Sequence, residues 1–200
     1  MTAANTGVVR AFNTISRVYD NRLVQRLAYR ANHDAVISAL RTHRARRIVD
    51  VGCGTGILAA RIARELSPEL VYGCDPSDGM LEKARARAAD VRWIQGAAEE
   101  LPLGDGAVDA VVTTEAFQFF DQAAALTDFH RVLEPGGHLV ISVITPALPV
   151  PGVVLDRIPA TWHTPAGMRR LVEAAGFEVV GQRRLGRVGP GVATVALKRA

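Results

Sequence analysis

The stretch Ile48-Val49-Asp50-Val51-Gly52-Cys53-Gly54-Thr55-Gly56 decides the fold of this chain. A short, mostly apolar run leads into three glycines that alternate with other residues, and a helical pattern begins at Ile57. Glycine permits tight backbone turns and the close approach of a ligand, and the helix that follows offers free N–H groups. The stretch therefore predicts a strand, a glycine turn and a helix that together form a nucleotide pocket.

The spacing of the glycines narrows the class of ligand. Dinucleotide-binding turns prefer G-x-G-x-x-G/A, which would require a small residue at position 57. Here the spacing is G-x-G-x-G and position 57 is Ile. This pattern resembles motif I of the class I S-adenosylmethionine (SAM) dependent methyltransferases. A nicotinamide-dependent oxidoreductase is a less favoured alternative, and Ile57 argues against it.

Composition sets the broad class of protein. The chain has 200 residues, of which 48% are hydrophobic and 22% charged, as expected of one globular domain. Its net charge of +4 is carried almost entirely by scattered arginines. A nucleic-acid binder would gather such charge on one face, so we expect a small-molecule partner and no nucleic acid. The oligomeric state stays open between monomer and homodimer.

The sequence also lacks patterns that would place the protein outside the cytoplasm or assign it a metal. The first residues lack a signal pattern and no apolar run is long enough to span a membrane. The chain has two cysteines, Cys53 and Cys74, and no Cys/His spacing typical of zinc. We therefore expect a cytoplasmic protein with reduced thiols, no membrane span and no metal.

Strand and helix patterns alternate along the chain. The expected strands are 47–51, 70–74, 91–95, 108–113, 138–144, 177–183 and 191–198, and the expected helices lie near 12–40, 57–66, 78–89, 122–133 and 165–175. Alternation with short connections predicts an α/β fold, with a doubly wound parallel sheet covered on both faces.

The end of the chain departs from plain alternation. The last two strands follow each other without a helix, so they must run antiparallel. Class I methyltransferases have such a hairpin, and the resemblance implies a Rossmann-like seven-stranded sheet of order 3-2-1-4-5-7-6 with strand 7 antiparallel. We expect a single domain over 1–200, made of an N-terminal helical cover (1–45), a SAM-binding core (46–145), a substrate-side loop (146–165) and a C-terminal helix and β-hairpin (166–200).

Ligands of such sheets bind outside the carboxyl ends of the strands. Gly73-Cys74-Asp75-Pro76-Ser77-Asp78-Gly79-Met80-Leu81 follows the second strand and resembles the family segment G-x-D-x-S-x-x-M-L. The resemblance assigns Asp75 to the ribose hydroxyls and places Met80 against the adenine. Asp78 is interpreted as the cap of the next helix.

The third strand is followed by a segment with one departure from the family pattern. Gly96-Ala97-Ala98-Glu99-Glu100-Leu101-Pro102-Leu103 resembles G-D-A-E-x-L-P-F, in which the Asp accepts the adenine amino group. Ala97 occupies the position of that Asp. The adenine would then be held by backbone groups near Ala97 and Ala98, or by Glu99. Ala97 also leaves open a degenerate methyltransferase fold that binds or regulates without turnover.

The remaining matches complete the resemblance. Arg131-Val132-Leu133-Glu134-Pro135-Gly136-Gly137 resembles the family's R-V-L-K-P-G-G turn into strand 5, and no D-P-P-Y motif of DNA-adenine and glutamine methyltransferases follows strand 4. The resemblance implies cofactor contacts from Asp50, Gly52, Cys53, Gly54, Gly56, Asp75, Pro76, Met80, Ala97, Ala98, Glu99, Thr114, Glu115, Gln118 and Tyr19. Among these, Asp50 would help to fix the ammonium of SAM, through water or the backbone.

The opening of the chain resembles one branch of the family. Phe12-Asn13-Thr14-Ile15-Ser16-Arg17-Val18-Tyr19-Asp20 is similar to the F-x-x-I-A-x-x-Y-D opening of the ubiquinone/menaquinone methyltransferases. The resemblance places Tyr19 over the SAM site, with helix packing as the alternative. The proline-rich segment 145–165 is expected to be a substrate-side loop. A pocket lined by Phe12, Tyr19, Phe120, Leu148 and Trp162 would suit an apolar or aromatic metabolite.

The catalytic residue is not identified by any motif. SAM carries an activated methyl group, so the protein mainly aligns a nucleophile and excludes water. A base is needed only when the nucleophile must lose a proton. The candidates are His163, Tyr19, Asp20 and Glu115.

Overall fold

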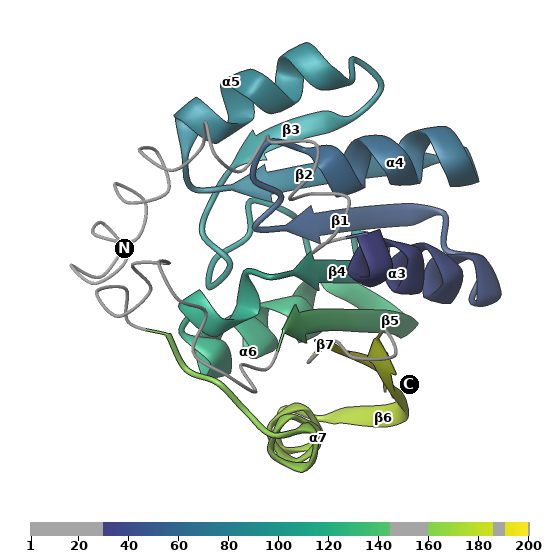
Figure 1. The fold of residues 1–200 in the computed structure, drawn as a ribbon, viewed down its shortest axis with the longest axis vertical. Coiled ribbons are helices and arrows are strands. Elements are labelled where there is room, and N and C mark those ends of the chain that lie inside the picture. Colours follow the sequence, from purple (N-terminus) through teal and green to yellow (C-terminus); the bar gives the residue numbers. More distant parts are fainter. Residues whose placement is uncertain (1–29, 145–159, 186–190, 200) are drawn as a thin grey trace.

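The computed structural model describes residues 30–144, 160–185 and 191–199, and its centre is a seven-stranded sheet of order β3-β2-β1-β4-β5-β7-β6 (Figure 1). The strands are β1 (Arg47–Val51), β2 (Leu70–Asp75), β3 (Arg92–Gln95), β4 (Val108–Thr114), β5 (Leu133–Ile144), β6 (Phe177–Leu185) and β7 (Gly191–Lys198). All pairs are parallel except those of β7, which is antiparallel to both β5 and β6. The predicted strand order and the antiparallel strand 7 are confirmed.

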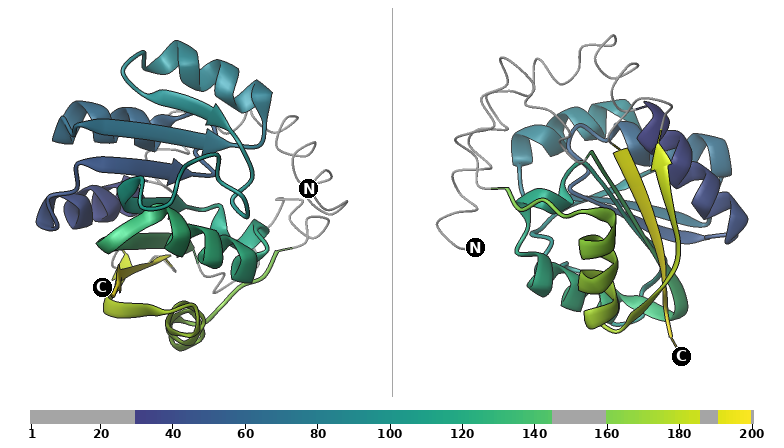
Figure 2. Two further views of the ribbon diagram at one scale, coloured as in Figure 1. Left: turned by 180° about the vertical axis from the view of Figure 1, so that it is seen from behind. Right: turned by 60° about the horizontal axis from the view of Figure 1, so that its bottom comes forward.

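Helices cover both faces of this sheet. On one face lie α3 (Arg30–Thr42), α4 (Ile57–Leu66) and α5 (Asp78–Arg87), of which α3 and α4 bury Val36, Leu40 and Ile62 in one apolar core. On the other face lie α6 (Gln122–Val132) and α7 (Pro165–Ala174), which bury Phe129 and Val172 in a second core. Figure 2 shows α6 in front of the sheet when the molecule is seen from behind. Since both faces are covered, the central strands are apolar on both sides.

Capping side chains decide where three helices begin. The Ser77 side chain accepts the N–H of Met80, so α5 starts at Asp78. Asp121 caps α6, and Thr164 caps α7 directly before a proline at its first position. The interpretation of Asp78 as the cap of α5 is wrong, because the serine before it accepts the orphan N–H. Asp78 instead lies in the first turn, where its negative charge suits the helix dipole.

The fifth strand begins earlier than the sequence predicts. Strand β5 starts at Leu133, which pairs with Val108, while Ala110 pairs with His138. The intervening residues 134–137 therefore bulge out of the ladder, and Gly136 adopts a φ of 82°. The expected start at 138 marks only the regular part of the strand.

The expected helix near 12–40 is described from Arg30 onward, and it continues to Thr42. Of the expected substrate-side loop 146–165, the structure describes residues 160–165, of which 160–164 are not helical and Pro165 already begins α7. The 3-10 helix η2 (Phe117–Phe119) was not predicted. Within the described ranges, no helix combines the length and the apolar character needed to cross a membrane.

A partly buried ion pair on α6 anchors the loop that follows β3. Asp128 accepts the backbone N–H of Leu101 at 2.6 Å and the Arg131 Nε at 2.7 Å. The Arg131 guanidinium also donates to the carbonyls of Leu103 and Leu101 at 2.7 and 3.0 Å. The turn motif that begins at Arg131 thus has a second role, since its arginine holds residues 101–103 against α6.

We expect Asp128→Ala to lower the free energy of unfolding by about 2–3 kcal/mol, because it leaves the buried Leu101 N–H without its acceptor and removes the closest carboxylate partner of Arg131. Asp105 contacts the same guanidinium but its side chain is 84% exposed, and Asp105→Ala should change stability by less than about 0.5 kcal/mol. Urea denaturation of both variants checks this. Equal effects would show that Asp128 does not anchor the loop.

Candidate active site

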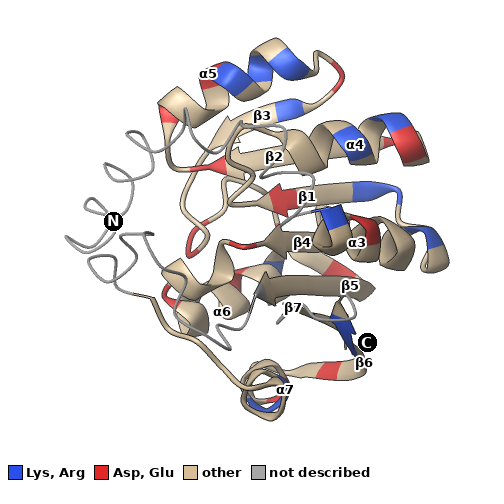
Figure 3. Ribbon diagram, in the orientation of Figure 1, with Lys and Arg blue, Asp and Glu red and all other residues tan. Residues whose placement is uncertain are grey.

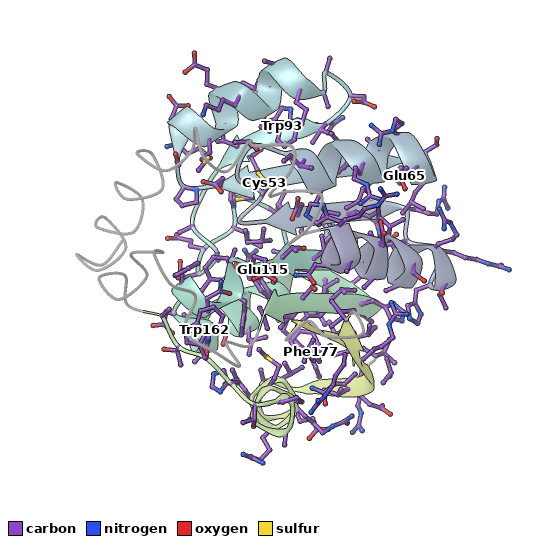
Figure 4. The ribbon with its side chains drawn as sticks, in the orientation of Figure 1. Cys53, Glu65, Trp93, Glu115, Trp162 and Phe177 are labelled. Carbon is purple, nitrogen blue, oxygen red and sulfur yellow. The ribbon has the colours of Figure 1, made fainter. Side chains whose placement is uncertain are left out.

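The carboxyl ends of β1, β2, β4 and β5 meet at one edge of the sheet. Figure 4 shows Cys53, Glu115 and Trp162 on the side toward which these strands point, whereas Glu65 lies toward the opposite end. The glycine turn after β1 is tied to β2, because the N–H groups of Gly52 and Cys53 both donate to the Cys74 carbonyl, at 2.8 and 3.1 Å. Residues from four strands therefore share one edge, as the sequence predicts.

The three glycines of the turn differ in what surrounds them. All three have positive φ, at 71°, 54° and 77° for Gly52, Gly54 and Gly56. A Cβ at Gly56 would lie 2.4 Å from the Trp93 ring, and one at Gly52 would lie 2.5 Å from the Ala116 Cβ. A Cβ at Gly54 would meet no described atom within 4 Å. Packing thus explains the first and third glycines, and Gly54 leaves open space above the turn.

Asp50 is a buried carboxyl with an unused oxygen. The residue is 2% exposed, and its Oδ2 has no hydrogen-bond partner among the described residues. Burial raises the pKa of Asp50 to about 7, with a further increase from the charge of Asp75 and an opposing hydrogen bond from the Ala59 N–H. A ligand ammonium would supply the missing partner and lower this pKa. Asp50 therefore fits the ammonium-binding role that the family resemblance implies.

Asp75 ends β2 and reaches back to the glycine turn. Its Oδ2 accepts the N–H of Gly54 at 2.8 Å and its Oδ1 accepts the N–H of Ser77 at 2.9 Å. Burial raises the pKa of Asp75, and these two hydrogen bonds act against the increase. Each oxygen keeps a further lone pair, so the carboxylate can also accept from two hydroxyls. This pattern suits a ribose diol.

The charge at this edge is acidic. Figure 3 shows acidic residues at the ends of β1 and β2, while basic residues lie on α4, on α5 and at the starts of β1 and β3. Two carboxyl groups with raised pKa values thus face the same region. Such a potential favours a cationic ligand over a phosphate-bearing one.

The predicted adenine side has its own internal contacts. The Glu99 carboxylate accepts the N–H of Asp121 at 2.9 Å, at the start of α6. Ala98 is buried in the core at 4% exposure, and Ala97 forms an isolated bridge with Glu100. The Pro76 carbonyl accepts from Gln95 at 3.1 Å. Glu99 therefore helps to position α6, and the expected adenine contacts stay open between the backbone near Ala97 and Ala98 and the Glu99 carboxylate.

Met80 and Cys53 were also predicted to contact the cofactor. Met80 is 4% exposed and lies in the buried first turn of α5. Burial raises the pKa of the Cys53 thiol well above its ordinary value and that of Cys74 to about 12, so both stay protonated. These thiols are structural and not nucleophilic.

The end of β4 holds a strained acidic residue. Glu115 has a φ of 55°, its N–H donates to the Ser142 carbonyl at 2.9 Å, and its own carbonyl accepts from the Gln118 side chain at 2.9 Å. The Asn32 side chain of α3 donates to the Glu115 carboxylate. Neither Asn32 nor Ser142 belongs to a motif, so no sequence pattern pointed to either residue at this site.

His163 contacts α6. Its Nε2 lies 2.6 Å from the Gln122 Oε1, and the Gln122 amide donates to the Thr161 carbonyl at 2.9 Å. The Thr161 N–H in turn donates to the Gln118 carbonyl at 2.8 Å. His163 thus helps to dock residues 161–163 on α6, and only its Nδ1 is left for a catalytic role.

The predicted substrate-lining residues divide into two groups. The Phe120 ring packs edge-on against Phe117 and Phe129 in the core and lies beside Gly52. Trp162 is half-buried in the segment that docks on η2. Phe12, Tyr19, Asp20 and Leu148 lie outside the described residues.

Comparison with known proteins agrees with this geometry. Residues 49–141 match a family of methyltransferase domains. A demethylmenaquinone methyltransferase of Corynebacterium kroppenstedtii is 30% identical over 70% of this chain and 71% of its own. The ubiquinone/menaquinone biosynthesis C-methyltransferase of Methylobacterium nodulans is 38% identical over 76% of this chain and 63% of its own. The chain spans as little as 38% of the length of other curated relatives.

A solved structure shows the same fold. The SAM-dependent methyltransferase of Thermotoga maritima, described as a possible histamine N-methyltransferase, is 26% identical and superposes with a TM-score of 0.74 over 94% of this chain and 98% of its own. The fold and the site define a Rossmann-like, SAM-binding protein. The chain belongs to the class I SAM-dependent methyltransferases, and SAM is its cofactor.

Proposed function

We propose that this protein transfers the methyl group of SAM to a small apolar or aromatic metabolite by in-line displacement. The observation that carries the proposal is the buried Asp50 Oδ2, which has no partner among the described residues and lies in the strand that leads into the glycine turn. Quinone precursors are one candidate class, because two relatives are named for ubiquinone or menaquinone biosynthesis.

The proposed roles follow from the chemistry of each group. SAM supplies a methyl group that is already activated by a sulfonium, so the nucleophile forms the new bond as the sulfur–carbon bond breaks. Asp50 holds the ammonium, Gly54 leaves room for the methionine moiety, and Asp75 accepts the ribose hydroxyls. The wider proposed cofactor set is Gly52, Cys53, Gly56, Pro76, Met80, Ala97, Ala98, Glu99, Thr114, Glu115, Gln118 and Tyr19.

Calorimetric titration with SAM and S-adenosylhomocysteine tests the cofactor site, and turnover of SAM with quinone-like, phenolic and amine acceptors tests the reaction. A chain that binds SAM but methylates none of these would favour the second candidate, a binding module without turnover. Ala97 favours that candidate, because it removes the usual acceptor for the adenine amino group. No binding of either compound would overturn both.

The raised pKa of Asp50 predicts how cofactor binding depends on pH. The ligand ammonium prefers the carboxylate, so below pH 7 binding must release the proton that the free protein holds on Asp50. Affinity for S-adenosylhomocysteine should therefore level off above pH 7 and fall below it by up to ~10-fold per pH unit. Calorimetry at pH 6.5 in two buffers of different ionisation enthalpy would report this proton release.

Asp50→Asn should abolish the proton release that accompanies binding of S-adenosylhomocysteine. It should also remove the fall in affinity below pH 7. The matched control is Asp109→Asn. Burial also raises the pKa of Asp109, but its carboxylate accepts the N–H groups of Arg46 and Arg47 at the opposite edge of the sheet. Identical pH profiles for Asp50→Asn and the wild type would contradict the role of Asp50.

A further inference from the structure

Four polar residues lie together at the carboxyl ends of β4 and β5, and we call them the polar row: Asn32, Thr114, Glu115 and Ser142. Thr114 and Ser142 are register partners in the parallel β4–β5 pair. Glu115 follows Thr114 directly, and its carboxylate accepts from Asn32 in the first turn of α3. The row therefore joins two strands and one helix at a single place.

The hydroxyls of the polar row point to the face covered by α3. Side chains alternate along a strand, so Thr114 and Ser142 share a face with Val112 and Val140, two residues earlier. Val112 and Val140 pack in the core beneath α3 and α4. On this face of the sheet, β4 and β5 are therefore apolar at Val112 and Val140 and polar two residues later, at their carboxyl ends.

Both hydroxyls of the polar row lack a hydrogen-bond partner in the part of the chain that the structure describes. Ser142 is fully buried, and its Oγ has no partner among the described residues; the same holds for the Oγ1 of Thr114. Leaving a buried hydroxyl unpaired destabilises a protein, whereas alanine or valine would fit both positions without that cost. A ligand that forms hydrogen bonds with these two hydroxyls would remove that cost.

The row lies beside the proposed cofactor site. Asp50 pairs with Val112, which precedes Thr114 by two residues on the same face. Ala116 follows Glu115 directly and packs against the glycine turn. A Cβ added to Gly52 would lie 2.5 Å from the Ala116 Cβ. A group bound on the polar row would therefore sit next to the methionine end of the cofactor.

We propose that the polar row binds a hydrogen-bond-donating group, a hydroxyl or an amine, on the methyl acceptor. The row is rich in acceptor atoms, namely the Glu115 carboxylate, the Asn32 Oδ1 and two hydroxyl oxygens. The carboxylate disfavours an acidic group at the same place. This inference rests on the proposed function and adds the chemistry by which the acceptor is selected.

The test measures the binding of small probes to the full chain saturated with S-adenosylhomocysteine. Phenol and aniline carry a donor, anisole lacks one, and benzoate carries a negative charge. Ligand-observed NMR should give phenol and aniline dissociation constants about 10-fold lower than those of anisole and benzoate. In Ser142→Ala this preference should disappear, while the affinity for S-adenosylhomocysteine and the Tm are not lowered.

Thr113→Val is the matched control. Thr113 is also fully buried, with an Oγ1 that has no partner among the described residues, but its register partner Ile141 lies in the core on the opposite face. It should keep the preference for phenol and aniline. An unchanged preference in Ser142→Ala, a loss of preference in Thr113→Val, or no preference in the wild type would each overturn the proposal. If S-adenosylhomocysteine itself does not bind, the proposed function fails as well. If it binds but the probe preference is absent, only the proposal for the polar row fails.

Discussion

Asp75→Asn is expected to lower the affinity for S-adenosylhomocysteine about 100-fold or more. Both oxygens of Asp75 accept backbone N–H groups, from Gly54 at 2.8 Å and from Ser77 at 2.9 Å. In the asparagine variant an amide NH₂ must face one of these donors, so the turn loses a contact. The ribose hydroxyls lose a charged acceptor at the same time, and truncating a buried charged hydrogen bond typically costs 2–5 kcal/mol.

The matched control for this prediction is Asp78→Asn. It makes the same chemical change three residues along the chain, on an exposed side chain that pairs with Arg85 on the surface of α5. It should leave the affinity within about 2-fold of the wild type. Calorimetric titration of both variants, with thermal unfolding to confirm that each is folded, is the measurement. Wild-type affinity in Asp75→Asn would mean that the ribose is held elsewhere.

Gly56→Ala is expected to lower the free energy of unfolding by about 2–5 kcal/mol. The new Cβ would lie 2.4 Å from the Trp93 ring and 2.9 Å from the Ala84 Cβ. Overpacking of this kind costs 1–3 kcal/mol, and the φ of 77° adds about 1–2 kcal/mol for any residue with a side chain. Urea denaturation measures the loss, and Trp93→Leu in the same chain should restore part of it by removing the clash.

Gly54→Ala separates folding from binding in the same turn. Its Cβ would meet no described atom within 4 Å, so only the backbone cost of about 1–2 kcal/mol is expected. Its affinity for S-adenosylhomocysteine should nevertheless fall, because the methyl group occupies the space proposed for the methionine moiety. Equal destabilisation by both substitutions would contradict the view that packing explains Gly56 and ligand space explains Gly54.

Local patterns were sufficient for most of the fold. The run 47–51 is mostly apolar and is followed by alternating glycines, and this combination already indicates a strand followed by a turn and a helix. The absence of a helix between the last two strands required an antiparallel hairpin, and the strand order followed from the family resemblance. The start of β5 was wrong because Glu134–Gly137 bulge out of the ladder, and a bulge depends on the partner strand.

The location of the cofactor side of the site could also be predicted from the sequence. Asp50, Gly54 and Asp75 occupy strand ends, and the edge at which parallel strands end is fixed by topology. The sequence could not distinguish the roles of the three glycines, because the Trp93 ring that excludes a side chain at Gly56 comes from a different strand. It also could not tell that Ser77 caps α5 and not Asp78, since both are good caps and only the observed backbone decides.

By itself, the sequence determined the fold class, the glycine turn, the acidic strand ends and the family, because each of these depends on residues that are close together in the chain. Only the tertiary structure decided which distant side chains meet. It brings Asn32 of α3 to Glu115, and Ser142 of β5 to Thr114 of β4. It also places the Lys198 Nζ 2.7 Å from the His130 carbonyl at the end of α6. Such contacts depend on helix placement and strand register, which arise when the two cores pack and leave no local pattern in the chain.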